Sequence, residues 1–269
     1  MSTRSVAVGA LRQVAALKDR VRPPKPGTAV LLYYRVGART PMSADLPRAR
    51  FADQMAKIAE RASTLDDALT ALEGPTPKAE SVVVTFDDGT ADLMEVALPV
   101  CVEHRVPMLL YLATRFVEEQ VDFPSEGRPT SWQALADGLT TGYLQVGSHT
   151  HSHALLDRID LASAEDELDR SIGLLQDRLG VEPAHFAYPK ALAPSAANEA
   201  AVRRRFRSAA LAGTRLNHPG ATDRWRLART PIQGRDDARW FDAKVAGGLS
   251  LEDDVRRLAN RYRYRGYES

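Results

Sequence analysis

The stretch Ser81-Val82-Val83-Val84-Thr85-Phe86-Asp87-Asp88-Gly89 decides the fold, because it joins an apolar run to a polar turn. Residues 81–86 are largely β-branched and apolar, which predicts a strand buried on both faces. Asp-Asp-Gly predicts a turn, and residues 91–104 predict a helix after it. A buried strand followed by a helix is typical of a parallel sheet.

The same cycle of strand and helix recurs on both sides of this stretch. Short apolar runs predict strands at 29–34, 106–113, 143–146, 184–188, 208–212 and 227–232. Helical spacing predicts helices over 51–62, 65–72, 132–139, 195–206 and 251–262, and another from an N-cap at Ser163 to Gly180. Alternating strands and helices predict the α/β class, with one domain over 27–269. Residues 118–131 carry no regular pattern, which suits either a lid or a solvated loop.

The amino-acid composition excludes several classes of protein. Among 269 residues, 36 Lys and Arg balance 35 Asp and Glu, which excludes the strongly basic balance of a protein whose main partner is nucleic acid. The single Cys101 excludes an internal disulfide and a cysteine-rich zinc site. With 44% hydrophobic and 26% charged residues, the chain resembles an ordinary soluble globular protein.

Residues 1–26 predict a basic helical segment. Arg12 and Gln13 interrupt its apolar run, so no secretory signal is expected and a cytoplasmic location is predicted. Two interpretations are open: the helix packs on its own domain with a solvated basic face, or it lies against an anionic membrane at the inner face. One acid, Asp19, stands among the six cations Arg4, Arg12, Lys18, Arg20, Arg22 and Lys25, with apolar Leu11, Val14, Leu17 and Val21 at helical spacing.

A histidine cluster follows the predicted strand at 143–146. Three of the six histidines fall within the five positions from His149 to His153. His149 and His153 are four residues apart, so a helical turn or a curved loop can direct both imidazoles to one point, whereas His151 should point elsewhere. Imidazole is the commonest metal ligand in proteins, but a purely structural cluster remains the alternative.

Asp87 and Asp88 favour the interpretation of that histidine cluster as a metal site. Taken alone, Asp-Asp-Gly is a turn. Together with two imidazoles, one carboxylate completes a facial ligand set that leaves coordination positions open, as in catalytic metal sites. A second carboxylate beside such a set is placed to take a proton from water.

The motifs Thr85–Gly89, Gly147–His153 and Phe186-Ala187-Tyr188-Pro189 resemble the polysaccharide deacetylase family, also called the NodB-homology domain or carbohydrate esterase family 4. The resemblance spans residues 29–232 and is nearest to the branch acting on exopolysaccharides and biofilms. It implies a distorted (β/α) barrel, a divalent metal, and hydrolysis of N-acetyl groups on glycans. By the same resemblance, Asp87 is the catalytic base and Asp88, His149 and His153 are the metal ligands. Zinc is the first expectation for the metal, with nickel, cobalt and manganese as alternatives.

Further roles also follow from the resemblance. The backbone N–H of Lys190 would complete the oxyanion hole, although members of the branch place an aromatic residue there. Tyr34 stands where the branch has histidine, so substrate contacts are expected to differ. Arg229 resembles an arginine that orients the base, with a structural ion pair as the alternative. His218 is a candidate general acid, but Asn217-His218-Pro219-Gly220 first indicates a turn.

The leading hypothesis is a metal-dependent deacetylase acting on an N-acetylated sugar or glycan through a metal-activated water, with a lipid-linked or nucleotide-linked sugar among the candidate substrates. An amidohydrolase acting on a formamide or a cyclic imide is the alternative among enzymes. A non-catalytic glycan-binding module of the same fold is the alternative from another class. No nucleic-acid partner is expected.

Overall fold

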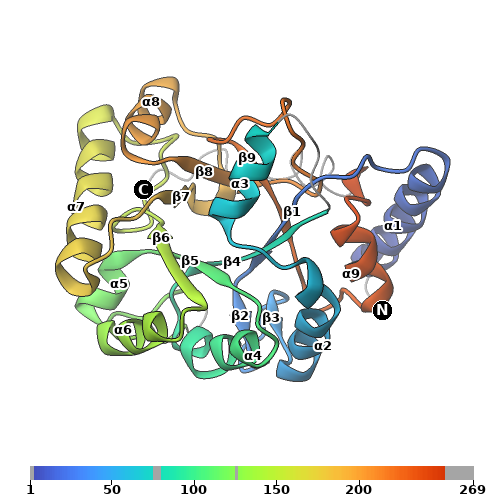
Figure 1. Cartoon of the computed structure of the whole chain (residues 1–269), viewed down its shortest axis with the longest axis horizontal. Coiled ribbons are helices and arrows are strands. Elements are labelled where there is room, and N and C mark those ends of the chain that lie inside the picture. Colours follow the sequence, from blue (N-terminus) through green and yellow to red (C-terminus); the bar gives the residue numbers. More distant parts are fainter. Residues whose placement is uncertain (1–2, 75–79, 125–126, 252–269) are drawn as a thin grey trace.

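The computed structural model describes residues 3–74, 80–124 and 127–251. Within them, seven parallel strands close into a barrel in the order β1-β4-β5-β6-β7-β8-β9, with helices around it (Figure 1). This confirms the α/β class and the (β/α) barrel predicted from the sequence. The barrel strands are β1 (Ala29–Tyr33), β4 (Val82–Asp88), β5 (Met108–Leu112), β6 (Leu144–Ser148), β7 (His185–Ala187), β8 (Ser208–Ala212) and β9 (Leu227–Pro231).

Neighbouring strands pair over more residues in one half of the barrel than in the other. Strands β1, β4, β5 and β6 pair over five residues each, whereas β6 and β7 share the single register pair Ser148 and Phe186. Pairing of Leu31 with Thr230 closes the ring between β1 and β9. The distortion of the barrel is therefore concentrated next to β7. A small separate sheet is formed by β2 (Arg35–Val36) and β3 (Asp45–Leu46).

One end of the barrel is closed by a helix. Leu65 and Leu69 of α3 (Leu65–Glu73) pack in one buried cluster with Val30, Val83 and Leu109, which lie toward the N-terminal ends of their strands. The opposite end, where the strands finish, carries the polar residues. As in other barrels of alternating strands and helices, that C-terminal end is where a site is expected.

The described residues form nine α-helices, most of which pack around the outside of the barrel. They are α1 (Thr3–Val21), α2 (Arg48–Ile58), α3 (Leu65–Glu73), α4 (Leu98–Glu103), α5 (Thr114–Glu119), α6 (Trp132–Thr140), α7 (Leu161–Leu179), α8 (Ala196–Arg205) and α9 (Ala238–Val245). Short turns η1 (Ala59–Arg61), η2 (Leu93–Ala97) and η3 (Pro189–Ala191) complete the elements.

Some boundaries differ from those predicted. The N-cap of α7 is Asp160, whose carboxylate accepts the Ser163 N–H, so the helix begins before the predicted cap at Ser163. Helices α5 and α9 were not predicted, and α5 takes up the start of the stretch at 118–131 that carries no regular pattern. The helix predicted over 251–262 lies outside the described residues from 252 onward.

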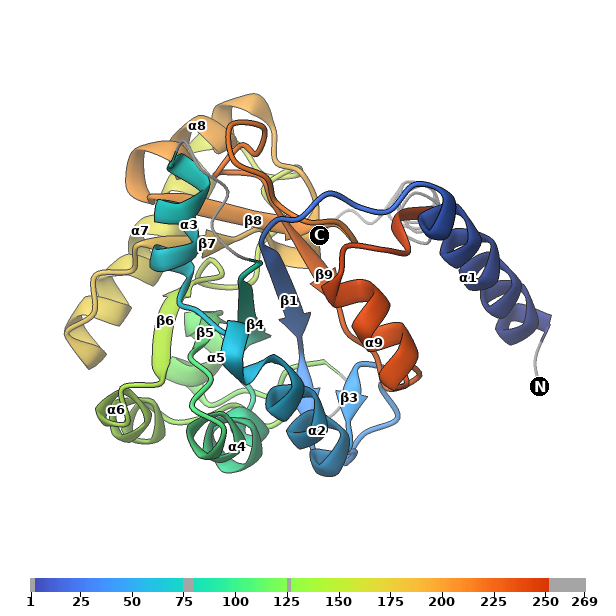
Figure 2. The ribbon, with the colours of Figure 1, turned by 45° about the vertical axis from the view of Figure 1, so that its right-hand side comes forward.

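Helix α1 lies at one edge of the molecule, beyond the ring of barrel helices (Figure 2). A buried ion pair fastens it to the body: the Arg12 guanidinium lies 2.6 Å from the Asp236 carboxylate, which also binds Lys244 of α9 at 2.7 Å. Among the residues described, no helix has both the length and the hydropathy that crossing a bilayer requires.

Candidate metal centre and adjacent carboxylate

The strand register brings the two polar motifs to one edge of the barrel. Asp88 pairs with Leu112 of β5, and Leu112 pairs with Ser148 of β6. His149 follows at once, and its N–H donates to the Leu112 carbonyl at 3.0 Å. Because parallel strands end together, Asp88 and His149, which are 61 residues apart in the sequence, meet at this mouth.

The backbone turns sharply after Asp87. Asp88 has a φ of 76° and Gly89 a φ of 114°, conformations that side chains other than glycine rarely adopt. A Cβ at Gly89 would lie 2.3 Å from the Leu112 Cδ1 atom, so the turn requires glycine. This strained turn lets Asp88 reach the histidines instead of the opposite face of β4.

Asp88, His149 and His153 converge on one point. The Asp88 Oδ1 atom lies 3.8 Å from His149 Nε2 and 3.6 Å from His153 Nε2, and the three ligand atoms all lie within 4.8 Å of one another. His149 Nδ1 lies 2.7 Å from the Ala187 carbonyl oxygen, which can only accept a hydrogen bond. That contact assigns the N–H to Nδ1 and leaves the Nε2 lone pair facing the other ligands.

The donor set fits a divalent cation. Burial lowers the pKa of His149 and of His153 to about 4, so both imidazoles are neutral near pH 7 and have a lone pair to share. Burial and the neighbouring Asp87 carboxylate raise the pKa of Asp88, while the charges of Lys190 and Arg35 oppose that shift. Two nitrogens and one oxygen form the three-ligand arrangement that leaves positions for water and substrate.

His151 lies apart from this set. It is buried, and its Nδ1 is 3.0 Å from the Thr114 hydroxyl. Its own carbonyl accepts the N–H of Arg115 at the start of α5. This histidine therefore anchors α5 against the loop that carries the ligands.

Asp87 is held by Arg229. The two guanidinium nitrogens lie 2.5 and 2.9 Å from the two carboxylate oxygens, and both side chains are almost fully buried. Burial alone would raise the pKa of Asp87, but the charge and hydrogen bonds of Arg229 outweigh it and lower the pKa below the ordinary value. Asp87 is consequently an anion, and its Oδ2 lies 3.9 Å from His149 Nε2.

Lys190 is placed beside the ligands, whereas His218 is not. Lys190 has a φ of 53° in the turn that follows β7, and its charge lowers the pKa of His153. His218 lies at the other end of the barrel, because its neighbour Asn217 bridges to Thr28 just before β1, and its Nδ1 contacts the Pro26 carbonyl. The structure thus corrects the sequence-based expectation that His218 could serve as a general acid at this site.

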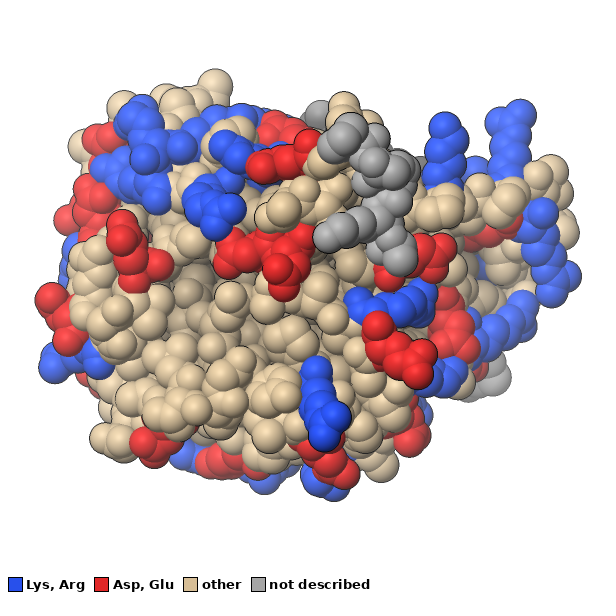
Figure 3. All heavy atoms as spheres, in the orientation of Figure 1, with Lys and Arg blue, Asp and Glu red and all other residues tan. Residues whose placement is uncertain are grey.

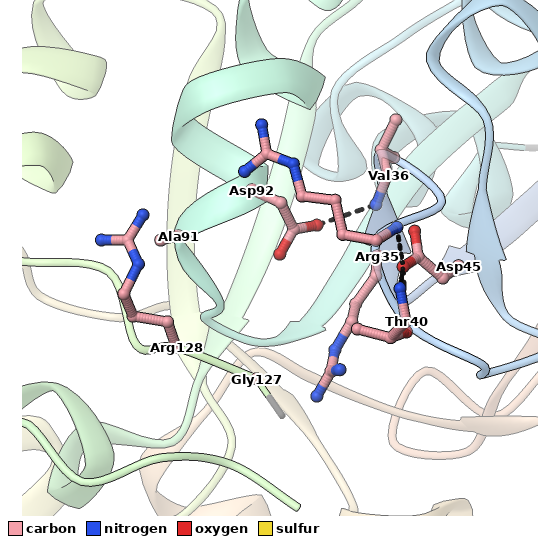
Figure 4. A pocket seen from close by; sticks show the side chains of 9 residues that line it. Arg35, Val36, Thr40, Asp45, Ala91, Asp92, Gly127 and Arg128 are labelled. Carbon is pink, nitrogen blue, oxygen red and sulfur yellow. Dashed lines mark hydrogen bonds between the residues drawn. The ribbon is translucent and has the colours of Figure 1, made fainter. Parts of the chain in front are cut away.

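A cavity of about 210 Å³ adjoins the mouth (Figure 4). The two carboxylates that line it accept hydrogen bonds from the backbone. Asp92 accepts the Val36 N–H at 2.8 Å. Asp45 accepts the N–H groups of Ala38, Arg39 and Thr40. Sequence analysis did not single out this cavity, since its residues come from three separate loops. It is lined by Arg35, Val36, Arg39, Thr40, Asp45, Ala91, Asp92, Gly127 and Arg128.

Comparisons with known proteins agree on the fold. Residues 74–208 match the family model described as polysaccharide deacetylase. The deacetylase PplD of Streptococcus pyogenes, solved with acetate, is 17% identical with a TM-score of 0.71, over 82% of this chain and 99% of that one. IcaB from Ammonifex degensii is 22% identical with a TM-score of 0.71, over 83% and 98% of the two chains. BC0361, a polysaccharide deacetylase from Bacillus cereus, is 19% identical with a TM-score of 0.69, over 81% and 69%. No curated protein sequence matches the chain.

Proposed function

Because this chain belongs to the polysaccharide deacetylase family, we propose that it hydrolyses N-acetyl groups on an N-acetylated sugar or glycan, with a divalent cation held by Asp88, His149 and His153. The observation that carries the proposal is the convergence of these three ligand atoms beside a buried, ionised Asp87. A module that only binds glycans has no use for a base next to a ligand set.

The bound cation would supply Lewis acidity, polarising the acetamide carbonyl and making a nearby water more acidic. The donor set of one carboxylate and two imidazoles is well suited to zinc, and also accepts nickel, cobalt or manganese. We take zinc as the first candidate.

Asp87 supplies the base. Its carboxylate is kept ionised by Arg229, so it can accept the proton of the attacking water. The water oxygen then adds to the carbonyl carbon, the proton taken up by Asp87 passes to the leaving nitrogen as the C–N bond breaks, and acetate and a free amine leave. Because Arg229 donates to both carboxylate oxygens of Asp87, we assign it the role of orienting the base and holding its charge.

The main chain after β7 stabilises the developing negative charge. Lys190 lies in a tight turn beside the ligands, and its backbone N–H is the candidate donor to the carbonyl oxygen. Any side chain except proline preserves that donor. The adjoining cavity, with guanidinium groups from Arg35, Arg39 and Arg128, is the proposed place for the sugar units next to the reacting one.

The substrate and the location of the enzyme complete the proposal. We propose a cytoplasmic enzyme whose N-acetylated sugar is carried on a lipid or a nucleotide. The departures from the pattern of the exopolysaccharide branch at Tyr34 and Lys190 support a substrate different from that of the branch.

Acetate release from a panel of N-acetylated oligosaccharides, lipid-linked sugars and sugar nucleotides tests the proposal, with and without a chelator. We expect release from at least one class, loss with chelator and recovery on adding zinc. Asp87→Asn should lower the rate of release by about 10²–10⁴-fold, whereas Asp137→Asn, which changes an exposed carboxylate on α6, should leave it unchanged. Release of formate or opening of a cyclic imide in place of acetate release would identify a different amidohydrolase. Glycan binding without any turnover would overturn the enzyme assignment.

A further inference from the structure

Helix α1 presents an apolar stripe to solvent. Val14 is 59% exposed, Leu17 is 62% exposed and Val21 is 76% exposed. Their spacing of three and four residues places them on one face of the helix. Among the described residues, the other exposed large apolar side chains are Val121 and Leu161, which are less exposed, at 38% and 41%, and stand singly near α5 and at the start of α7.

The opposite face of α1 is fixed to the body of the protein. Arg12 and Ala15 are buried, and the Asp19 carboxylate accepts the Leu249 N–H at 2.7 Å. At 3.6 residues per turn this face lies about 160° from the apolar stripe. Rolling the helix inward to cover the stripe would break the buried Arg12–Asp236 pair, so the stripe is held outward.

Cations border the stripe on both sides. Lys18, Arg20, Arg22 and Lys25 are all exposed, and the acid of this segment, Asp19, is engaged with the backbone of Leu249. Figure 3 shows Lys and Arg side chains gathered around the end of the molecule that α1 forms. A face with apolar residues in the middle and cations at its edges complements an apolar layer beneath anionic groups.

We propose that α1 is a peripheral anchor that lies along an anionic bilayer surface, with Val14, Leu17 and Val21 at the acyl boundary and the cations at the lipid headgroups. A second copy of this chain suits the stripe less well, because pairing two such helices would bring like charges together. The anchor goes beyond the proposed activity and does not depend on it.

Flotation of the full chain with vesicles tests the anchor without any sugar present. Vesicles of phosphatidylglycerol and phosphatidylcholine in equal parts are compared with vesicles of phosphatidylcholine alone, at low and high salt. We expect binding to the anionic vesicles that weakens with salt, because exposed charges are screened. Lys18→Gln combined with Arg20→Gln should reduce partitioning by about 25-fold, from about fivefold for each cation.

Matched variants separate the stripe from general surface effects. Val14→Gln, Leu17→Gln and Val21→Gln together should abolish flotation, whereas Val121→Gln with Leu161→Gln should not. Arg48→Gln with Arg170→Gln removes two exposed cations elsewhere and should leave binding unchanged. Melting curves check that each variant is folded and are expected to match that of the wild type.

Three results would overturn the anchor. The first is no binding of the wild type to anionic vesicles, and the second is equal binding by the stripe variant. The third is a dimer in solution, seen by sedimentation, that the stripe variant loses, since a second copy would then cover the stripe.

Discussion

The buried ion pair between Arg229 and Asp87 leads to a specific prediction about stability and pH dependence. In Arg229→Gln, a carboxylate that is almost fully buried loses both of its charged hydrogen bonds. Removing one partner of a buried ion pair costs about 3–5 kcal/mol of folding free energy. For a chain of this size we expect a melting temperature lower by about 6–20 °C near pH 7.

The sign of the pH dependence follows from the same contact. In the wild type the pKa of Asp87 lies below its ordinary value, so the pair stabilises the fold above the usual carboxyl range and the gain is lost as pH falls through the depressed pKa. Without Arg229, burial raises the pKa of Asp87. The acid limb of the pH–activity profile should move to higher pH, and turnover below that limb should fall by about 10²–10⁴-fold because the base is protonated.

Two variants make this measurement decisive. Arg205 forms a similar two-point contact with Asp169, at 2.6 and 2.8 Å, but Asp169 is 59% exposed. Arg205→Gln should therefore cost about 0–1 kcal/mol and leave the pH profile unchanged. Arg229→Lys keeps a positive charge and should recover part of the activity. An acid limb at the wild-type position in Arg229→Gln would refute the orienting role, and a drop in stability alone would leave Arg229 as a structural ion pair.

Four other outcomes are expected. Metal analysis should find about one divalent ion per chain, and Asp88→Ala, His149→Ala or His153→Ala should each lower that occupancy; full occupancy in all three would return the histidines to a structural role. Asp87→Asn should retain the metal while turnover falls by about 10²–10⁴-fold, and unchanged turnover would remove Asp87 from the mechanism. The protein treated with chelator should lose stability as pH falls from 6.5 toward about 4, because His149 and His153 bind protons in the unfolded chain but stay neutral when buried. A free energy of unfolding that does not change over this pH range would contradict the neutral state of the two histidines. Gly89→Ala should destabilise the fold and reduce metal occupancy together, since the added carbon would lie 2.3 Å from a leucine methyl of β5; a wild-type melting curve would show that the turn can relax.

The sequence predicted the strands better than the helices. Runs such as 82–86 and 108–112 are uninterrupted and apolar because both faces of a barrel strand are covered, and that pattern is visible without any structure. Helix α5 has six residues, too few to show a helical period. Helix α9 has eight residues, and the signal that could have revealed it is Asp237, whose carboxylate caps the Trp240 N–H.

At the site, local spacing was informative and long-range contacts were not. The positions of Asp88, His149 and His153 within their motifs allowed a metal set to be predicted, and the structure brings the three together. The placement of His218 depends on a bridge between Asn217 and Thr28, 189 residues apart, which no local pattern encodes. The cavity lined by arginines was missed for the same reason.

The fold holds the two carboxylates of the site more firmly than it holds the two imidazoles. The spacing between proton acceptor and ligand carboxylate is set by consecutive backbone bonds and a turn wedged against Leu112. The imidazoles, by contrast, reach that point from a loop after β6, where the barrel pairs with β7 at a single register position. Heat or denaturant should therefore displace the two imidazoles first. Inactivation should begin with weaker binding of the cation, while Asp87 and Asp88 still keep their positions.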